Sequence, residues 1–110
     1  MKERRAEPRL LCSDLIKVRL EDCGLVDLVA NLEDISPSGA TVLFEQAVRT
    51  GTRLRLMLGR HRFDGHVTHC THNELGFYVG VRFDEGKEWS RRIYEPKHLL
   101  DLRELVARKR

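Results

Sequence analysis

The sequence predicts a mainly β fold, a six-stranded antiparallel β-barrel followed by a C-terminal α-helix. Apolar and polar residues alternate through six short segments, which is the period of a half-buried strand. Residues typical of tight turns separate these segments. After residue 86 the apolar period changes to that of a helix. Short antiparallel strands of this number can close into a barrel, which leaves no free sheet edge.

Each expected strand carries an apolar side chain at every second position, so these side chains share one face. In the first strand, Ile16, Val18 and Leu20 alternate with Lys17 and Arg19. The six strands are expected at residues 16–20, 26–35, 40–44, 54–58, 63–67 and 77–84, within a barrel that covers residues 10–84.

The connection after the second strand has the composition of a tight turn. In Ser36-Pro37-Ser38-Gly39, proline sets its own φ in advance, and Gly39 tolerates a positive φ. The other expected turns are Asp22-Cys23-Gly24, Arg49-Thr50-Gly51, Gly59-Arg60-His61 and His72-Asn73-Glu74.

The end of the chain predicts a helix within residues 88–108. Pro96 can occupy the first turn of a helix, and Leu99, Leu102 and Val106 recur at helical spacing. A shorter helical turn is expected at residues 89–94. The leucines would pack either on the barrel or on a second copy of the chain, which would make a homodimer.

Composition restricts the class of protein. A chain of 110 residues with 41% hydrophobic and 34% charged residues is expected to form one globular domain, residues 1–110. No apolar run is long enough for membrane insertion and the N-terminus lacks an apolar signal core, so a cytoplasmic protein is expected. Three cysteines without a C-x-x-C pair fit a reducing compartment. A net charge of +3 makes nucleic acid an unfavourable partner.

Neither catalysis nor metal binding is predicted. His66 and His69 are expected on opposite faces of a strand, whereas a structural zinc site needs four convergent ligands. Asp34 and Ser36 are expected on one loop, with no histidine near them in sequence to complete a catalytic triad. We therefore expect no enzyme, no metal and no cofactor.

Two polar segments do indicate a ligand. Residues 1–9 are expected to form a flexible basic arm that carries Arg4, Arg5 and Arg9. Guanidinium groups pair with phosphate and with guanine O6 and N7. The segment Asp34-Ile35-Ser36-Pro37-Ser38-Gly39 offers a carboxylate, hydroxyls and backbone groups. Together the arm and the turn predict a site for a small anionic nucleotide.

These segments resemble the signatures of PilZ domains. Arg5-Ala6-Glu7-Pro8-Arg9 matches R-x-x-x-R, and Asp34-Ile35-Ser36-Pro37-Ser38-Gly39 matches (D/N)-x-S-x-x-G. The strand Gly80-Val81-Arg82-Phe83 is also similar to that family. The resemblance covers nearly the whole chain and implies a β-barrel that binds the bacterial second messenger cyclic di-GMP, with no catalytic activity.

The resemblance also implies a role for each motif residue. Arg5 and Arg9 would contact phosphate and guanine, and Arg4 would extend the motif to R-R-x-x-x-R, which goes with a stacked ligand dimer. The turn would contribute as well: Asp34 and Ser36 would hydrogen-bond a guanine edge, and Gly39 would let the backbone approach. The signal would then pass to a downstream protein partner.

Two alternatives remain open from the sequence. One is a protein-interaction adaptor with the same fold and no ligand. The other is a small basic barrel that binds RNA or single-stranded DNA through exposed aromatic rings. Phe63, Phe77 and Phe83 fall on the apolar faces of their strands and only Tyr78 faces outward, which disfavours the second alternative.

Overall fold

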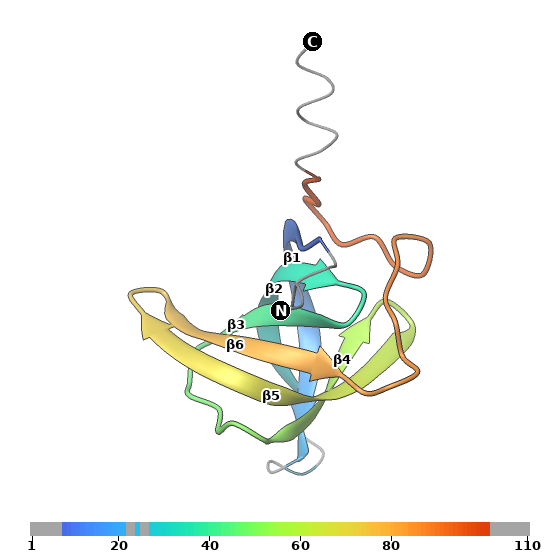
Figure 1. Cartoon of the computed structure of the whole chain (residues 1–110). Coiled ribbons are helices and arrows are strands. Elements are labelled where there is room, and N and C mark those ends of the chain that lie inside the picture. Colours follow the sequence, from blue (N-terminus) through green and yellow to red (C-terminus); the bar gives the residue numbers. More distant parts are fainter. Residues whose placement is uncertain (1–7, 22–23, 25–26, 102–110) are drawn as a thin grey trace, which may run out of the picture.

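Six antiparallel strands form a closed barrel in the computed structural model, which describes residues 8–21, 24 and 27–101 (Figure 1). The strands are β1 (Leu10–Leu20), β2 (Asp27–Ser36), β3 (Gly39–Phe44), β4 (Arg53–Leu58), β5 (His61–Asn73) and β6 (Gly76–Phe83). Their order around the barrel is β1-β2-β3-β6-β5-β4, and β4 closes it by pairing with β1. The predicted six-stranded antiparallel barrel is confirmed.

The core follows from the alternation of the sequence. Side chains at every second strand position point inward and pack together, and burial of each large one contributes about 1.5–3 kcal/mol. Phe63 and Phe83 are both buried, with ring centroids 5.0 Å apart. The fully buried side chains are Val18, Leu32, Ile35, Val42, Leu56, Leu58, Phe63, Val67 and Val79.

Three strands contain an irregularity that the alternation does not predict. The register shifts between Leu11 and Asp14 in β1, and again in β2 and β5. In β5 the shift lies between Val67 and His69. Since an extra residue resets which face the following side chains occupy, His66 and His69 both face outward, and the prediction of opposite faces is wrong. Within the part of the chain that the structure describes, no group of three or more His, Cys, Asp or Glu residues could hold a metal ion.

The segment after β6 is not the expected helix. Between residues 88 and 101 the structure has two turns, at residues 91–93 and 97–98, and an isolated bridge from Leu100 to Leu11. In the first turn the N–H groups of Ile93 and Tyr94 donate to the carbonyl of Ser90. The prediction of a helix is therefore wrong for these residues, and residues 102–108 of the expected helix lie outside the described residues. No helix of the described residues is long and apolar enough to cross a bilayer.

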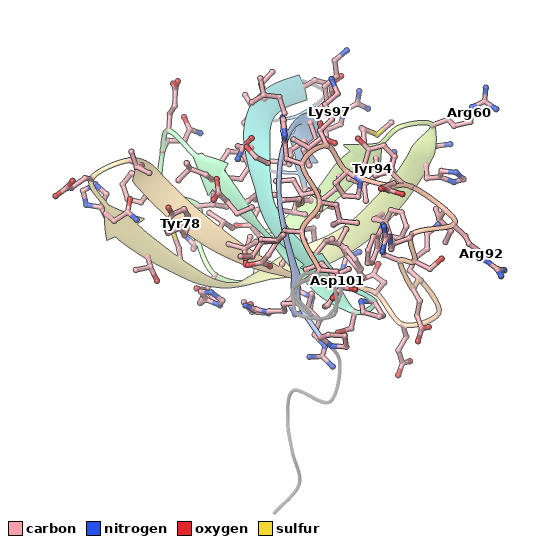
Figure 2. The ribbon with its side chains drawn as sticks, turned by 90° about the horizontal axis from the view of Figure 1, so that it is seen from above. Arg60, Tyr78, Arg92, Tyr94, Lys97 and Asp101 are labelled. Carbon is pink, nitrogen blue, oxygen red and sulfur yellow. The ribbon has the colours of Figure 1, made fainter. Side chains whose placement is uncertain are left out.

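Contacts with distant strands explain why this segment is extended. The carbonyl of Lys97 accepts from the N–H of Ser13 (3.1 Å), and the N–H of Leu100 donates to the carbonyl of Leu11 (2.7 Å). Backbone groups that pair with β1 in this way are not available to a helix. Figure 2 shows the segment crossing the barrel with Tyr94 and Lys97 along it, whereas Arg60 and Arg92 point away from the molecule.

Candidate functional site

Asp34 and Ser36 lie on either side of Ile35 on the outer face of β2, where both side chains are largely buried. Ile35 between them is fully buried, so alternation places both polar side chains on the outer face. They were expected on a loop, but both are strand residues, and only Pro37 and Ser38 connect β2 to β3. A strand holds side chains more rigidly than a loop does, which suits a binding site.

The carboxylate of Asp34 is incompletely satisfied. Its side chain is 14% exposed, and Oδ2 lies 3.7 Å from Nη1 of Arg9, which is an ion pair without a close hydrogen bond. Its Oδ1 atom is buried and has no hydrogen-bond partner in the described structure. A buried acceptor without a donor is unfavourable by about 1–3 kcal/mol, so this oxygen is suited to receive a donor from a ligand.

Nearby acidic groups suppress the reactivity of a neighbouring thiol. Burial, followed by the charges of Asp34, Asp14 and Glu33, raises the pKa of Cys12 to about 12. The Cys12 thiol donates to the carbonyl of Leu32 (3.5 Å). Since the thiolate is the nucleophilic form, Cys12 is a packing residue of the site.

Glycine is required at position 39 for a steric reason, which the sequence did not reveal. Gly39 is not among the described residues with a positive φ, so its tolerance of that conformation is not what the turn uses. A Cβ atom at this position would instead overlap the carbonyl oxygen of Val81 on β6. Glycine is therefore needed because β3 and β6 approach closely beside the turn. Ser36 Oγ donates across the same turn to the carbonyl of Gly39, at 3.4 Å.

Two distant segments hold the turn between β2 and β3. The carbonyl of Ser38 accepts from the N–H of Phe83 (2.8 Å), and that of Pro37 accepts from the N–H of Trp89 (3.0 Å). The indole of Trp89 is buried, and its Nε1 donates to the carbonyl of Tyr94 (2.8 Å). The sequence analysis did not assign Trp89 to the site; its being the only tryptophan of the chain was the available signal.

A buried carboxylate anchors the start of β1 next to Arg9. Asp14 accepts hydrogen bonds from the Tyr94 hydroxyl and from the N–H of Lys97 (3.2 Å). Burial, and then the hydrogen bond and charge of Asp14, raise the pKa of Tyr94 to about 12. Sequence reasoning missed this pair because its members are far apart in the chain.

The structure thus brings four of the six predicted site residues together. Leu11 pairs with Asp34, and Ser36 pairs with Gly39, so β1, β2 and β3 meet at one place. Arg9 lies just before β1, with a side chain that is 40% exposed. Arg4 and Arg5 lie outside the described residues.

Comparison with models of protein families identifies the family of the chain. The family model of the PilZ domain matches residues 3–95. The chain belongs to the PilZ family. A comparison with curated protein sequences gives no match.

Solved PilZ structures share the fold of this domain. It is similar to the PilZ domain with c-di-GMP of YcgR from Escherichia coli, with a TM-score of 0.58 and 19% identity over 76% of this chain and 79% of that one. YcgR from the same organism in complex with c-di-GMP gives 0.60 and 20% identity over 76% of this chain and 39% of that one. The Bacillus subtilis inhibitor of motility MotI/DgrA gives 0.58 and 14% identity, covering 76% and 44%.

The longer relatives extend well beyond this PilZ domain, which spans less than half of each of them. At these identities the likeness establishes the fold. The chemistry must therefore be argued from the residues of this PilZ domain itself.

Proposed function

We propose that this PilZ domain is a non-catalytic receptor for cyclic di-GMP. The ligand-binding residues in this proposal are Arg4, Arg5, Arg9, Asp34, Ser36 and Gly39. The observation that carries it is the unsatisfied Oδ1 of Asp34, whose other carboxylate oxygen, Oδ2, lies 3.7 Å from Nη1 of Arg9. The c-di-GMP in the two YcgR structures of the same fold supports the choice of ligand.

The chemistry of guanine matches these groups. Its N2 amino group is a donor, which Asp34 can accept, and its O6 and N7 are acceptors for a bidentate arginine. The phosphodiesters of the ligand are acceptors for further guanidinium groups. A single molecule with both chemistries satisfies Asp34 and Arg9 without bringing two separate ligands to the site.

The proposed mechanism is an ordering of the arm, residues 1–9, over the ligand. Fixing the backbone costs about 1–2 kcal/mol per residue. Charge-assisted hydrogen bonds, at about 1.5–3 kcal/mol each, offset this cost. Arg4 extends the motif to R-R-x-x-x-R, which in the family goes with a stacked ligand dimer, and the stoichiometry of the titration distinguishes one bound molecule from two.

The output of the receptor is proposed to be a contact with a downstream protein. A fold shared with an inhibitor of motility is consistent with an effect exerted on another protein. A homodimer through the last residues and a cytoplasmic location remain predictions. The adaptor without a ligand and the nucleic-acid binder are the outcomes that a ligand titration distinguishes.

Isothermal titration with cyclic di-GMP tests the proposal. The wild-type chain should release heat on binding, and Arg9→Ala or Arg5→Ala should lose measurable binding while the thermal unfolding curve stays cooperative. Arg60→Ala is the matched control, because Arg60 is an exposed arginine that points away from the barrel. Wild-type affinity in Arg9→Ala would refute the assignment, and absence of binding by the wild type would leave the adaptor.

Asp34→Ala separates a binding role from a structural one. Loss of the guanine partner should weaken binding by about 1–3 kcal/mol, which is about 5- to 150-fold. The free energy of unfolding should fall by no more than about 1 kcal/mol, because the buried Oδ1 has no protein donor to lose and the ion pair of Oδ2 with Arg9 is long and partly exposed. A destabilised variant with unchanged affinity would make Asp34 a structural residue.

A further inference from the structure

Arg82 lies on the outer surface next to the candidate site but outside both sequence motifs. On β6 its neighbours Val81 and Phe83 are buried, so the Arg82 side chain faces outward and is exposed. Its backbone pairs with Gly39 on β3 and with His66 on β5. One row across the outer surface therefore runs from Ser36 through Gly39 to Arg82.

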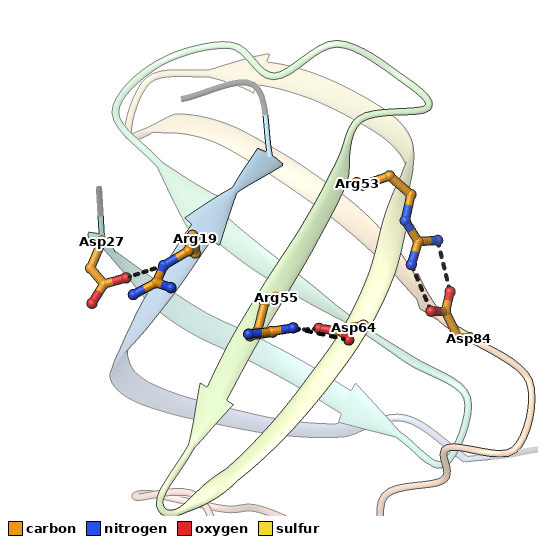
Figure 3. A network of polar contacts seen from close by, with 6 residues as sticks. All are labelled: Arg19, Asp27, Arg53, Arg55, Asp64 and Asp84. Atoms are coloured by element: carbon orange, nitrogen blue, oxygen red, sulfur yellow. Dashed lines mark hydrogen bonds and ion pairs between the residues drawn. The ribbon is translucent and has the colours of Figure 1, made fainter. Parts of the chain in front are cut away.

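No described residue forms an ion pair or hydrogen bond with the Arg82 guanidinium. The nearest acid along the same face, Asp84, is engaged by Arg53 in a two-pronged pair at 2.7 and 2.9 Å (Figure 3). Two other outward arginines in Figure 3, on β1 and β4, are also paired: Arg19 with Asp27 and Arg55 with Asp64. Arg82 thus differs from these arginines, since its charge is left for a partner outside the described residues.

Two rows of paired residues cross from β2 to β6, and one of them is free of side chains between its ends. In the row through Asp34, Thr41 and Gly80, the ring of His69 occupies the space above Gly80. In the row through Ser36, the only residue before Arg82 is Gly39, which has no side chain. Ser36 and Arg82 are two strand spacings apart, about 10 Å.

This arrangement sets two requirements on one ligand. Asp34 needs a hydrogen-bond donor, because its Oδ1 is unsatisfied. The exposed Arg82 can bind an acceptor-rich or anionic group about 10 Å from Ser36 across β3. A mononucleotide held by Asp34 and Arg9 has already used its base edge and its phosphate at the β2 end, whereas a dinucleotide has a second nucleotide that can cross Gly39.

We propose that Arg82 is a further ligand-binding residue, which contacts the second nucleotide of a bound cyclic dinucleotide across Gly39. The inference rests on the proposed function. It makes Arg82 the residue that favours a dinucleotide over a mononucleotide, and it places the ligand across β3 and β6 instead of over the turn alone.

Titration of Arg82→Ala, Arg82→Lys and Arg60→Ala with cyclic di-GMP tests this inference. Loss of charge-assisted hydrogen bonds should weaken binding by about 10- to 100-fold in Arg82→Ala. Arg82→Lys should fall between this variant and the wild type, because lysine keeps the charge but not the planar fork. Arg60→Ala carries the same change in net charge and should bind like the wild type.

The outcomes separate the two proposals. If the wild type binds and Arg82→Ala binds as tightly as Arg60→Ala, the inference about Arg82 fails while the receptor function stands. If the wild type does not bind, the receptor function fails. Equal thermal unfolding of Arg82→Ala and the wild type excludes loss of fold as the cause of weaker binding.

Discussion

Two turns of this barrel have the same length and similar composition, yet different surroundings. Ser36 to Gly39 joins β2 to β3, and Asn73 to Gly76 joins β5 to β6; each begins with a polar residue and ends with glycine. In the second turn the Asn73 side chain accepts from the N–H groups of Leu75 (2.8 Å) and Gly76 (3.2 Å). Leu75 is 71% exposed, and the hairpin projects from the barrel (Figure 1).

The first turn, by contrast, depends on other parts of the chain. The carbonyls of Pro37 and Ser38 are bound by Trp89 and Phe83, and Ser36 itself is buried. The comparison teaches that turn chemistry alone does not make a site. The backbone of the β2–β3 turn is held by two distant segments, whereas the side-chain contacts that the structure describes for the β5–β6 turn come from its own asparagine.

The largest expected effect comes from removal of the support of the first turn. Trp89→Ala deletes a buried indole, and such changes cost about 3–5 kcal/mol of stability. Leu75→Ala in the other turn should change stability by no more than about 0.5 kcal/mol, because the side chain is exposed. Urea unfolding of both variants measures the difference, and equal losses would contradict the comparison.

The two turn glycines give a smaller effect that separates stability from binding. A Cβ at Gly39 would overlap the carbonyl of Val81, and a Cβ at Gly76 would overlap the carbonyl of Phe44. Gly76 also has a φ of +145°, which residues with a side chain rarely adopt. Each change to alanine should cost about 1–3 kcal/mol of stability. Only Gly39→Ala should also weaken binding of cyclic di-GMP. A matching loss of affinity in Gly76→Ala would show that the effect is global.

The smallest effect concerns Asp14 and Tyr94, which hold the last described segment against β1. At neutral pH, Tyr94→Phe removes one hydrogen bond and should cost about 0.5–1.5 kcal/mol. The pKa of Tyr94 is raised from 10.0 to about 12 on folding, so its stabilising effect is complete below pH 10 and is lost as the pH rises toward 12.

The stability difference between the wild type and Tyr94→Phe should therefore narrow above pH 10, as measured by urea unfolding at increasing pH. Cys12, whose pKa is also raised to about 12, is present in both proteins, and its charge is the smallest of the causes that raise the pKa of Tyr94. A difference that stays constant with pH would show that Tyr94 does not titrate with folding.

The strands could be predicted because their signal is local. The alternation of Ile16, Val18 and Leu20, or of Val79 and Val81, requires no knowledge of the partner strand, and these side chains are buried as expected. The ends of strands were less well predicted: β5 continues to Asn73, through residues expected as a turn. His69 was assigned to the wrong face, because a register shift depends on the neighbouring strand.

The helix predicted near the C-terminus failed because contacts with a distant strand oppose it. Leu99 satisfies a helical pattern, but its neighbours donate and accept hydrogen bonds with β1, and such contacts outweigh a weak local preference. The site divides in the same way. Arg9, Asp34, Ser36 and Gly39 were identifiable from sequence spacing, whereas Asp14, Tyr94 and Trp89 join the site only through contacts between distant segments.

The sequence by itself determined the six strands, the inward and outward faces of most residues, and the two motifs that place charge near one turn. These depend on the period of the chain and on the chemistry of single residues. Only the tertiary structure decided that Asp34 keeps an unsatisfied oxygen, that Gly39 is required by the approach of β6, and that Arg82 lies unpaired beside it. Those facts are fixed by strand pairing across the barrel, because hydrogen bonding and steric overlap depend on distances between residues far apart in sequence.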